Sequence, residues 1–337
     1  MKEALDANRL RRMGLPGIIL GLGIHPFFAS WVKTYGARIY DLTATVAFIG
    51  EIVLFGLILS SATTYIYYIY EGFRLPLLTR AARGWNERRL RRTVDALREL
   101  YASRTRDNLG PTERELATEL TERLADFPLL ETDEGLHPTV ERPTLLGNII
   151  ATYELYSLTR YKIDGRTYWH QILSCAPESI RKDFDDSMSF AESLLLASAA
   201  SFLVSIVAVL VLVGLFFGNL SERLAVATVA LSPTAGTTLF VAGLLGWWIF
   251  YQLAITAHRE VASVFRALVD VAMDDFVSWL TRVSLPSTPM APRAAAVAEY
   301  LNFGVRMKEV VPHSATPHRP STPQKDPPNL PGSHETA

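Results

Sequence analysis

The sequence predicts an all-α membrane protein, in which about four transmembrane helices carry an α-helical cytoplasmic insertion and a helical stalk. Two uncharged stretches support this prediction most strongly, residues 193–217 and 224–257. About 20 apolar residues in a helix cross a hydrocarbon layer, so each stretch suffices. Pro233 divides the second stretch, which leaves a span over about 234–257. A soluble helix of this length would keep a polar face, so the sequence favours the bilayer.

Two further apolar stretches precede these. Residues 42–70 contain one charge, Glu51, and end in four tyrosines. Tyrosine is favoured at the level of lipid headgroups, where its ring is apolar and its hydroxyl reaches water, so we expect a span here. Residues 15–32 form a shorter stretch that contains His25-Pro26. This stretch spans the membrane, re-enters it or lies on its surface.

The distribution of basic residues favours four spans over three. Lys and Arg near the ends of a span favour the cytoplasmic side. With four spans, thirteen basic flanking residues lie on the cytoplasmic side and three on the other. We therefore expect both termini in the cytoplasm. The predicted parts are an N-terminal membrane hairpin (1–70), a cytoplasmic helical domain (71–191), a second membrane hairpin (192–257), a cytoplasmic stalk (258–311) and a disordered proline-rich tail (312–337).

The composition of the 337 residues excludes several classes of protein. Lys and Arg number 33 and Asp and Glu number 34, a net charge of −1, which excludes a strongly basic nucleic-acid binder. The single cysteine, Cys175, excludes a disulfide within the chain and a cysteine-rich metal site. Motifs of phosphate-binding loops, zinc proteases and serine hydrolases are absent from the sequence. We therefore expect no enzyme activity, no catalytic residues, no metal and no cofactor.

Charge is segregated within the cytoplasmic domain, where apolar residues recur at helical spacing. Residues 74–106 carry a net charge of +7 and residues 107–134 a net charge of −7. One interpretation is an antiparallel helical hairpin with complementary faces, whose second helix begins with the capping pattern Thr112-x-x-Glu115. A second, compatible interpretation places the basic helix against anionic lipid headgroups, each arginine gaining about 1 kcal/mol. The candidate headgroup-binding residues are Arg74, Arg80, Arg83, Arg88 and Arg89.

Helical patterns flank the second membrane hairpin on both sides. Ile180 and Phe184 precede it at helical spacing, and Phe265 and Phe276 belong to a longer stripe that follows it. Both patterns lie on the same side of the membrane, so we expect them to pack together as a stalk. One continuous helix over about 234–283 would be about 75 Å long at 1.5 Å per residue.

Polar residues inside the predicted spans indicate one candidate site. Glu51 is the most informative, because an ionisable side chain within a span is costly and often functional. His25 and Gln252 are its candidate partners, and the three are consistent with movement of a proton or cation. The alternative is a structural carboxylate packed against a polar neighbour. Small residues such as Ser201 and Ser205 also line the spans and favour close helix packing, within one chain or between subunits.

Residues 143–172 are rich in aromatic side chains and differ from their surroundings. They form either the core of the cytoplasmic domain or a pocket for a ligand or partner. The candidate pocket residues are Asn148, Tyr153, Arg160, Tyr161, Asp164 and Trp169.

The same segment carries a resemblance to known proteins. Its motifs are Pro143-Thr144-x-Leu146-Gly147-Asn148, Arg160-Tyr161-x-Ile163-Asp164 and Trp169. This pattern resembles one found in a group of uncharacterised bacterial multi-span membrane proteins. The resemblance implies a bacterial inner-membrane location and carries over no activity. The departure is Lys162, where the pattern favours glycine; the turn is then expected at Asp164-Gly165.

Three functions remain open. The first is a non-enzymatic membrane scaffold or sensor, whose cytoplasmic domain binds a partner protein or forms a homo-oligomer. The second is an oligomeric channel or transporter that uses Glu51. The third is a membrane enzyme acting on lipid, which needs a nucleophile or metal at the interface that the sequence does not reveal. The expected surroundings are the lipid bilayer, including anionic lipids, and nucleic acid is not an expected partner.

Overall fold

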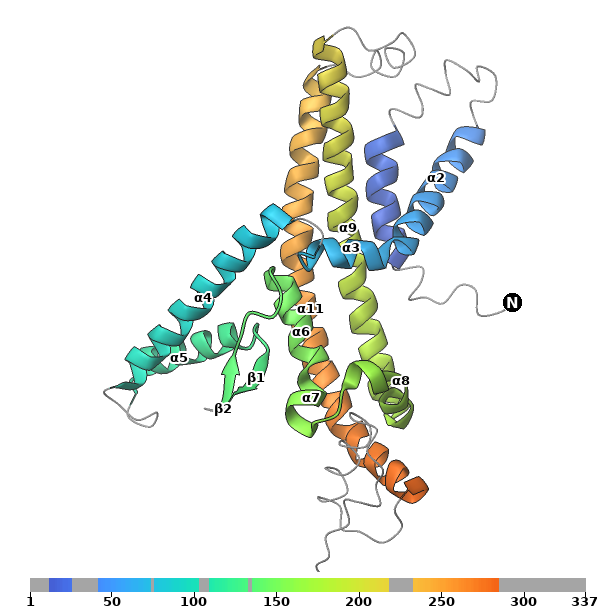
Figure 1. Ribbon diagram of the computed structural model, residues 1–337. Coiled ribbons are helices and arrows are strands. Elements are labelled where there is room, and N and C mark those ends of the chain that lie inside the picture. Colours follow the sequence, from blue (N-terminus) through green and yellow to red (C-terminus); the bar gives the residue numbers. More distant parts are fainter. Residues whose placement is uncertain are drawn as a thin grey trace, which may run out of the picture.

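A computed structural model describes residues 12–25, 42–73, 76–102, 109–132, 135–217 and 233–284. The predicted proline-rich tail, the stalk beyond residue 284 and Arg74 lie outside the described residues. Helix dominates the described part of the chain, as the sequence predicts. Figure 1 shows two long helices at the centre, with shorter elements arranged around them.

The central helices are α9 (Glu178–Phe217) and α11 (Pro233–Ser284), which run antiparallel. The predicted continuous helix is confirmed by α11, whose 52 residues correspond to about 78 Å. Small residues let the two backbones approach closely. A Cβ on Gly243 would lie 2.8 Å from the carbonyl oxygen of Ser201. The face of α9 that includes Ser201 therefore packs within the chain.

The outward sides of both central helices are apolar over one half of the pair, which contains the end of α9 and the start of α11. We call this the apolar half. Leu210 and Trp248, for example, expose 61% and 58% of their surfaces. Each helix contains a stretch long and apolar enough to cross a membrane, Glu178–Val213 and Pro233–Ser278. An exposed apolar surface of this kind suits contact with lipid better than contact with water.

The helix over residues 12–25 and α2 (Leu42–Ser61) lie beside the apolar half of α9 (Figure 1). Glycine is required where their backbones meet, because a Cβ on Gly56 would lie 2.6 Å from the carbonyl oxygen of Met13. Arg12 Nε lies 2.9 Å from a carboxylate oxygen of Glu192. This ion pair fixes the start of the first helix beside the start of the uncharged stretch of α9.

The sequence predicts one span over residues 42–70, whereas the structure has two helices there. These are α2 and α3 (Thr63–Tyr70), bent by 60° at their junction. The hydroxyls of Ser61 and Thr63 donate to carbonyls of the preceding turn at 2.8 and 2.7 Å, and such bonds favour a bend. Figure 1 shows α3 lying across the central helices, so the terminal tyrosines lie in this transverse helix.

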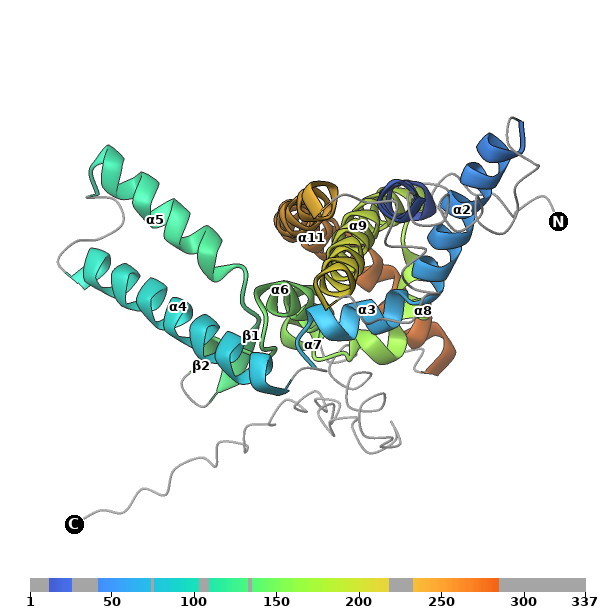
Figure 2. The same ribbon diagram turned by 90° about the horizontal axis from the view of Figure 1, so that it is seen from above.

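Helices α4 (Pro76–Ala102) and α5 (Pro111–Leu124) form a two-helix arm that projects from the central pair (Figures 1 and 2). Their pairing is the helical hairpin that the segregated charges predict. The predicted cap of α5 is wrong by two residues. The Gly110 N–H donates to Glu113 Oε2 at 2.8 Å, because a proline at the first helical position sets the start of the helix.

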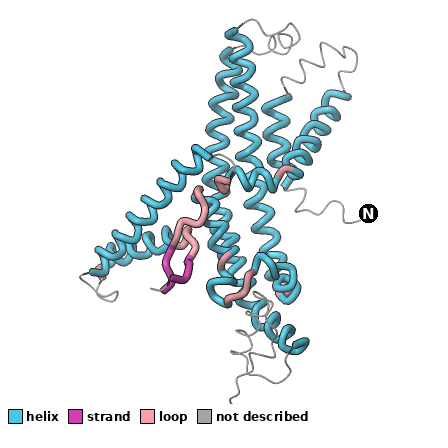
Figure 3. Tube along the Cα trace, viewed as in Figure 1, coloured by secondary structure: helices cyan, strands magenta, loops and turns pink. Residues whose placement is uncertain are grey.

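The predicted all-α fold is confirmed, and a short hairpin of strands interrupts the helices. Strands β1 (Leu129–Thr132) and β2 (Gly135–Pro138) pair as an antiparallel hairpin. Figure 3 shows these strands as the magenta segment beside the helices. Proline residues precede β1 and end β2, where they interrupt any helix. Gly135 has φ +113°, a conformation that favours glycine.

Three short helices follow and pack against the stalk: α6 (Leu145–Glu154), α7 (Tyr156–Tyr161) and α8 (Gly165–Cys175). The contact is aromatic. Trp169 stacks on Phe265 with 5.0 Å between ring centroids, and Phe184 contacts both rings. Phe184 and Phe265 are buried, which confirms the predicted packing of the two stalk patterns.

Candidate functional site

A polar cavity lies at the base of the arm, where α4, α5, α6 and α11 meet. Its volume of about 440 Å³ falls in the range of small-molecule sites, about 300–1,000 Å³. Four arginines and three carboxylates line this cavity, which we call the Asp126 cavity. They are Arg89, Arg123, Arg259, Arg266, Glu119, Glu122 and Asp126.

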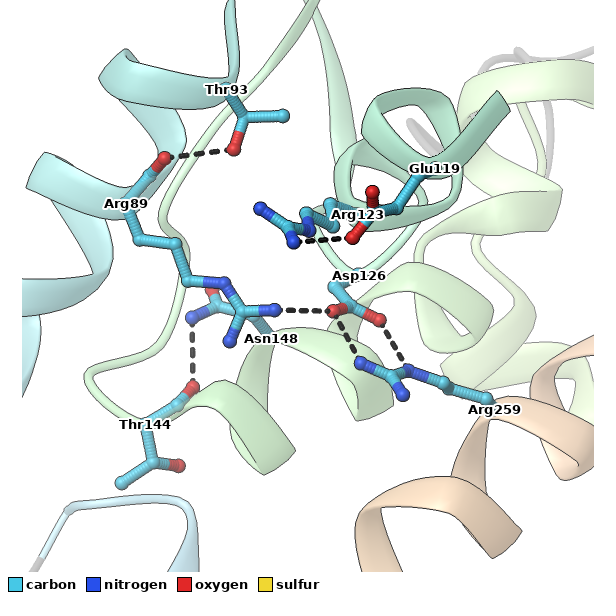
Figure 4. A network of polar contacts seen from close by, with 8 residues as sticks. All are labelled: Arg89, Thr93, Glu119, Arg123, Asp126, Thr144, Asn148 and Arg259. Carbon is cyan, nitrogen blue, oxygen red and sulfur yellow. Dashed lines mark hydrogen bonds and ion pairs between the residues drawn. The ribbon is translucent and has the colours of Figure 1, made fainter. Parts of the chain in front are cut away.

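Asp126 is the centre of this cluster (Figure 4). It lies in the turn after α5, and 2% of its side chain is exposed. Arg259 of α11 donates to both of its carboxylate oxygens, from Nε at 2.7 Å and from Nη2 at 2.8 Å. Arg89 of α4 donates to it from Nη2 at 3.3 Å. Bidentate pairs of arginine and carboxylate are strong and directional, so one buried carboxylate joins the arm to α11.

The other two arginines of the cavity are held differently. Arg123 donates to Glu119 at 2.5 Å on the exposed side of α5. Arg266 Nε donates to the Ala262 carbonyl of its own helix at 3.0 Å. Within the described residues Arg266 forms no ion pair, although the exposed carboxylate of Glu122 on α5 lines the same cavity.

The arginines of the Asp126 cavity are suited to bind an anion. Burial lowers the pKa of Arg89 from its ordinary value, and the Asp126 carboxylate opposes that change. Arginine begins from so high a pKa that it stays charged in proteins, so the cavity presents cations partly removed from water. In the part of the chain that the structure describes, no group of three or more His, Cys, Asp or Glu side chains is arranged to hold a metal ion.

An apolar cavity of about 410 Å³ adjoins the Asp126 cavity. The two share Ala125, Thr152 and Arg266 in their linings. The β-hairpin contributes Leu129 and Leu136 to the apolar cavity, and these side chains are 46% and 53% exposed. Polar and apolar walls therefore meet at Arg266.

Asn148, a predicted pocket residue, is wholly buried and holds the loop before α6. It accepts from the Arg142 N–H at 3.0 Å and donates to the Arg142 carbonyl at 2.7 Å. Thr144 caps α6 by accepting from the Gly147 N–H at 3.0 Å, and its hydroxyl donates to the Tyr70 carbonyl at 2.6 Å. The Pro-Thr-x-Leu-Gly-Asn motif thus joins α6 to the end of α3.

Tyr153 and Trp169 belong to the aromatic contact between the short helices and the stalk. The Tyr153 ring lies 5.3 Å from the Phe265 ring, and burial raises the pKa of Tyr153 above its ordinary value. The core interpretation of the aromatic segment fits these two residues.

Arg160 and Tyr161 meet Asp270 of α11. Tyr161 Oη donates to Asp270 at 2.7 Å, Tyr156 Oη donates to it at 2.8 Å, and Arg160 Nε lies 3.4 Å from it. Burial and the hydrogen bond to Asp270 raise the pKa of Tyr156 to about 12. These contacts attach α7 to the stalk.

The turn of the Arg-Tyr-x-Ile-Asp motif lies at Lys162 and not at Asp164-Gly165. Lys162 has φ 58° and ψ 25°, the left-handed conformation that glycine adopts most easily. It is the one non-glycine residue with positive φ among those described. Asp164 instead accepts from the Thr167 hydroxyl at 2.7 Å, and Gly165 begins α8. The position where the pattern favours glycine is therefore one whose backbone favours it.

Of the polar residues in the predicted spans, two lie together. His25 Nδ1 is 3.0 Å from Glu51 Oε2, and the His25 ring contacts the Phe48 ring edge-on at 4.8 Å. Gln252 is exposed on α11 and forms no hydrogen bond with this pair in the described residues.

The candidate headgroup-binding arginines divide into two groups. Arg80, Arg83 and Arg88 are exposed along α4. Arg89 instead turns inward to Asp126. The sequence gives little signal for the latter contact, because Asp126 is one of nine acids between residues 107 and 134. The position of Asp126 in the sequence does not distinguish it from solvated carboxylates, and the same is true of Asp270.

Fold and contacts together define a class: a helical protein with two helices able to cross a membrane and a charged cavity beside them. No protein-family model, curated protein or solved structure matches the chain. Its function is therefore inferred from geometry.

Proposed function

We propose that the protein is a non-enzymatic integral membrane protein that acts as a membrane-anchored scaffold or sensor. Its helical cytoplasmic region binds a partner protein or a second copy of the chain. The arm carries this proposal, because it projects from the central pair and exposes Arg80, Arg88 and Trp85, the last by 72% (Figures 1 and 2). Arginine and tryptophan are enriched among the residues that dominate binding at interfaces.

The proposed location is a bacterial inner membrane, with four spans and both termini in the cytoplasm. The apolar outward faces of α9 and α11 support insertion. The ion pair between Arg12 and Glu192 supports a first helix that starts on the same side as the span of α9. Arg80, Arg83 and Arg88 are then available to anionic headgroups or to an acidic partner.

Photo-cross-linking in native membranes tests the role of the arm. A photoreactive residue replaces Trp85 in one variant and the outward-facing Leu210 in a matched control. We expect adducts with a protein, either a partner or a second copy of the chain, from position 85 and none from position 210. Absence of adducts at position 85, or equal yields at both positions, would contradict the proposal.

A second candidate function is an oligomeric channel or transporter, favoured by the contact between His25 and Glu51 in the apolar half. Ionisable groups inside a membrane often mark ion or proton pathways. Flux through liposomes that contain the purified chain tests this function. Flux that Glu51→Gln abolishes would support it, and a wild-type chain without flux would eliminate it.

A further inference from the structure

We propose that the Asp126 cavity and the adjoining apolar cavity form one binding site for a single-chain anionic amphiphile, such as a fatty acid, outside the bilayer. The anionic head would lie among the arginines and the chain would fill the apolar cavity. This inference goes beyond the proposed function, because the site would bind its ligand whether or not the arm binds a partner.

The charge on the inner wall favours an anionic head. The single charge of Asp126 is shared by Arg89 and Arg259 through its ion pairs, and Arg266 has no such partner within the described residues. Glu119 and Glu122 also line the cavity, but Glu119 is paired with Arg123 and 55% exposed, and Glu122 is exposed on α5. The lining therefore keeps one more arginine than carboxylates. A carboxylate or phosphate accepts two hydrogen bonds from one guanidinium. Arg266 donates from Nε to the Ala262 carbonyl, and its two Nη groups can donate to such an anion.

The apolar cavity favours a hydrocarbon chain. Leu129 and Leu136 lie on its wall and remain largely exposed. Phe127 and Leu155 line the same space, and both cavities are large enough for small-molecule binding. An acyl chain there would remove the two exposed leucines from water.

The order of the two cavities along α11 distinguishes a detached amphiphile from a bilayer lipid. Arg259 follows the predicted span, and Arg266 lies seven residues further, about 10 Å along a helix. The apolar cavity adjoins Arg266 and reaches Tyr156 and Arg160, whose partner Asp270 is further still from the span. A lipid anchored in the bilayer would direct its chains the other way, so a single-chain molecule outside the bilayer fits better.

Labelling with a photoactivatable palmitate tests the site in the full chain, held in phosphatidylcholine nanodiscs. We expect adducts in residues 124–138, in addition to adducts in the outward-facing residues of the spans. Arg266→Gln should lower labelling of 124–138 about tenfold, since hydrogen bonds to charged groups contribute that much. Labelling of the spans reports partition into the bilayer and should not change. The matched control is Arg98→Gln, since the side chain of Arg98 is 77% exposed on α4 and outside both cavities.

Three results would overturn the proposal. The first is wild-type labelling confined to the spans. The second is equal labelling of 124–138 in wild type and Arg266→Gln. The third is loss of that labelling when phosphatidylglycerol is added to the nanodiscs, which would assign the arginines to bilayer lipid. Leu136→Ser provides a second variant with every arginine intact, and it too should lower labelling of 124–138. Because the readout is a lipid adduct, it is separate from the protein adducts that test the arm.

Discussion

The contact between α9 and α11 and the contact between the arm and α11 are built from different interactions. The first uses small neutral residues at close range, with Ser198 Oγ donating to the Trp247 carbonyl at 2.9 Å. The second uses one buried carboxylate between two arginines. Packing of small residues depends on shape, whereas the ion pairs of the arm depend on charge, and another anion can compete for the same arginines. We therefore expect a rigid central pair, and an arm whose attachment to α11 weakens when another anion binds the arginines.

The largest effect is expected from breaking the central pair. Gly243→Leu would force a side chain against the backbone of Ser201 and the hydroxyl of Ser205. The two helices could make room for this side chain only by moving apart. Overpacking of this kind costs about 3 kcal/mol, measured as a fall in the thermal unfolding temperature in detergent. Leu245→Ala is the matched control, since Leu245 is 55% exposed on the same helix. Equal unfolding temperatures for both variants would contradict the shape-dependent contact.

A smaller and local effect is expected from Asp126→Asn. The substitution leaves Arg89 and Arg259 without their shared carboxylate, at a cost of about 2 kcal/mol for charged hydrogen bonds. Hydrogen exchange should accelerate in α4 and α5 and stay unchanged in α9. Glu119→Gln, in the same cavity but exposed, should leave exchange near wild type. Acceleration spread evenly over all helices would show that the arm is not attached separately.

The same contrast explains how much the sequence can predict. The length of α11, the apolar faces and the aromatic packing of Phe184 and Phe265 follow from periodicity and hydropathy, which are local properties. The attachment of the arm depends on the meeting of Asp126 with Arg259, 133 positions apart, and no local pattern reports such a contact. The α2–α3 bend and the β-hairpin depend on hydroxyls, proline and glycine in segments whose apolar pattern is ambiguous.

The turn at Lys162 lies in neither contact and offers a stabilising change. Lys162→Gly removes the strain of a left-handed side-chain residue, offset by the greater freedom of glycine in the unfolded chain, for a net gain of about 0.5–1 kcal/mol. The exposed ion pair with Glu131 contributes little. Lys162→Ala removes that pair but keeps the Cβ, so it should give no gain in unfolding temperature. A gain in both variants would show that loss of the lysine side chain, and not relief of backbone strain, stabilises the chain.

The smallest effect concerns the contact of α7 with α11, which resembles the arm in relying on a carboxylate. The pKa of Tyr156 is raised to about 12 by burial and by the hydrogen bond to Asp270, so the folded chain holds this proton more tightly than the unfolded chain. The resulting stabilisation is complete below the ordinary tyrosine pKa of about 10 and is lost as the pH rises from there through 12. Tyr156→Phe lacks both the bond and its titration, while every other tyrosine titrates in both proteins. The difference in unfolding temperature between wild type and Tyr156→Phe should therefore be larger at pH 8 than at pH 11. A difference that is equal at the two pH values would show that the Tyr156 hydroxyl does not stabilise the folded chain through Asp270.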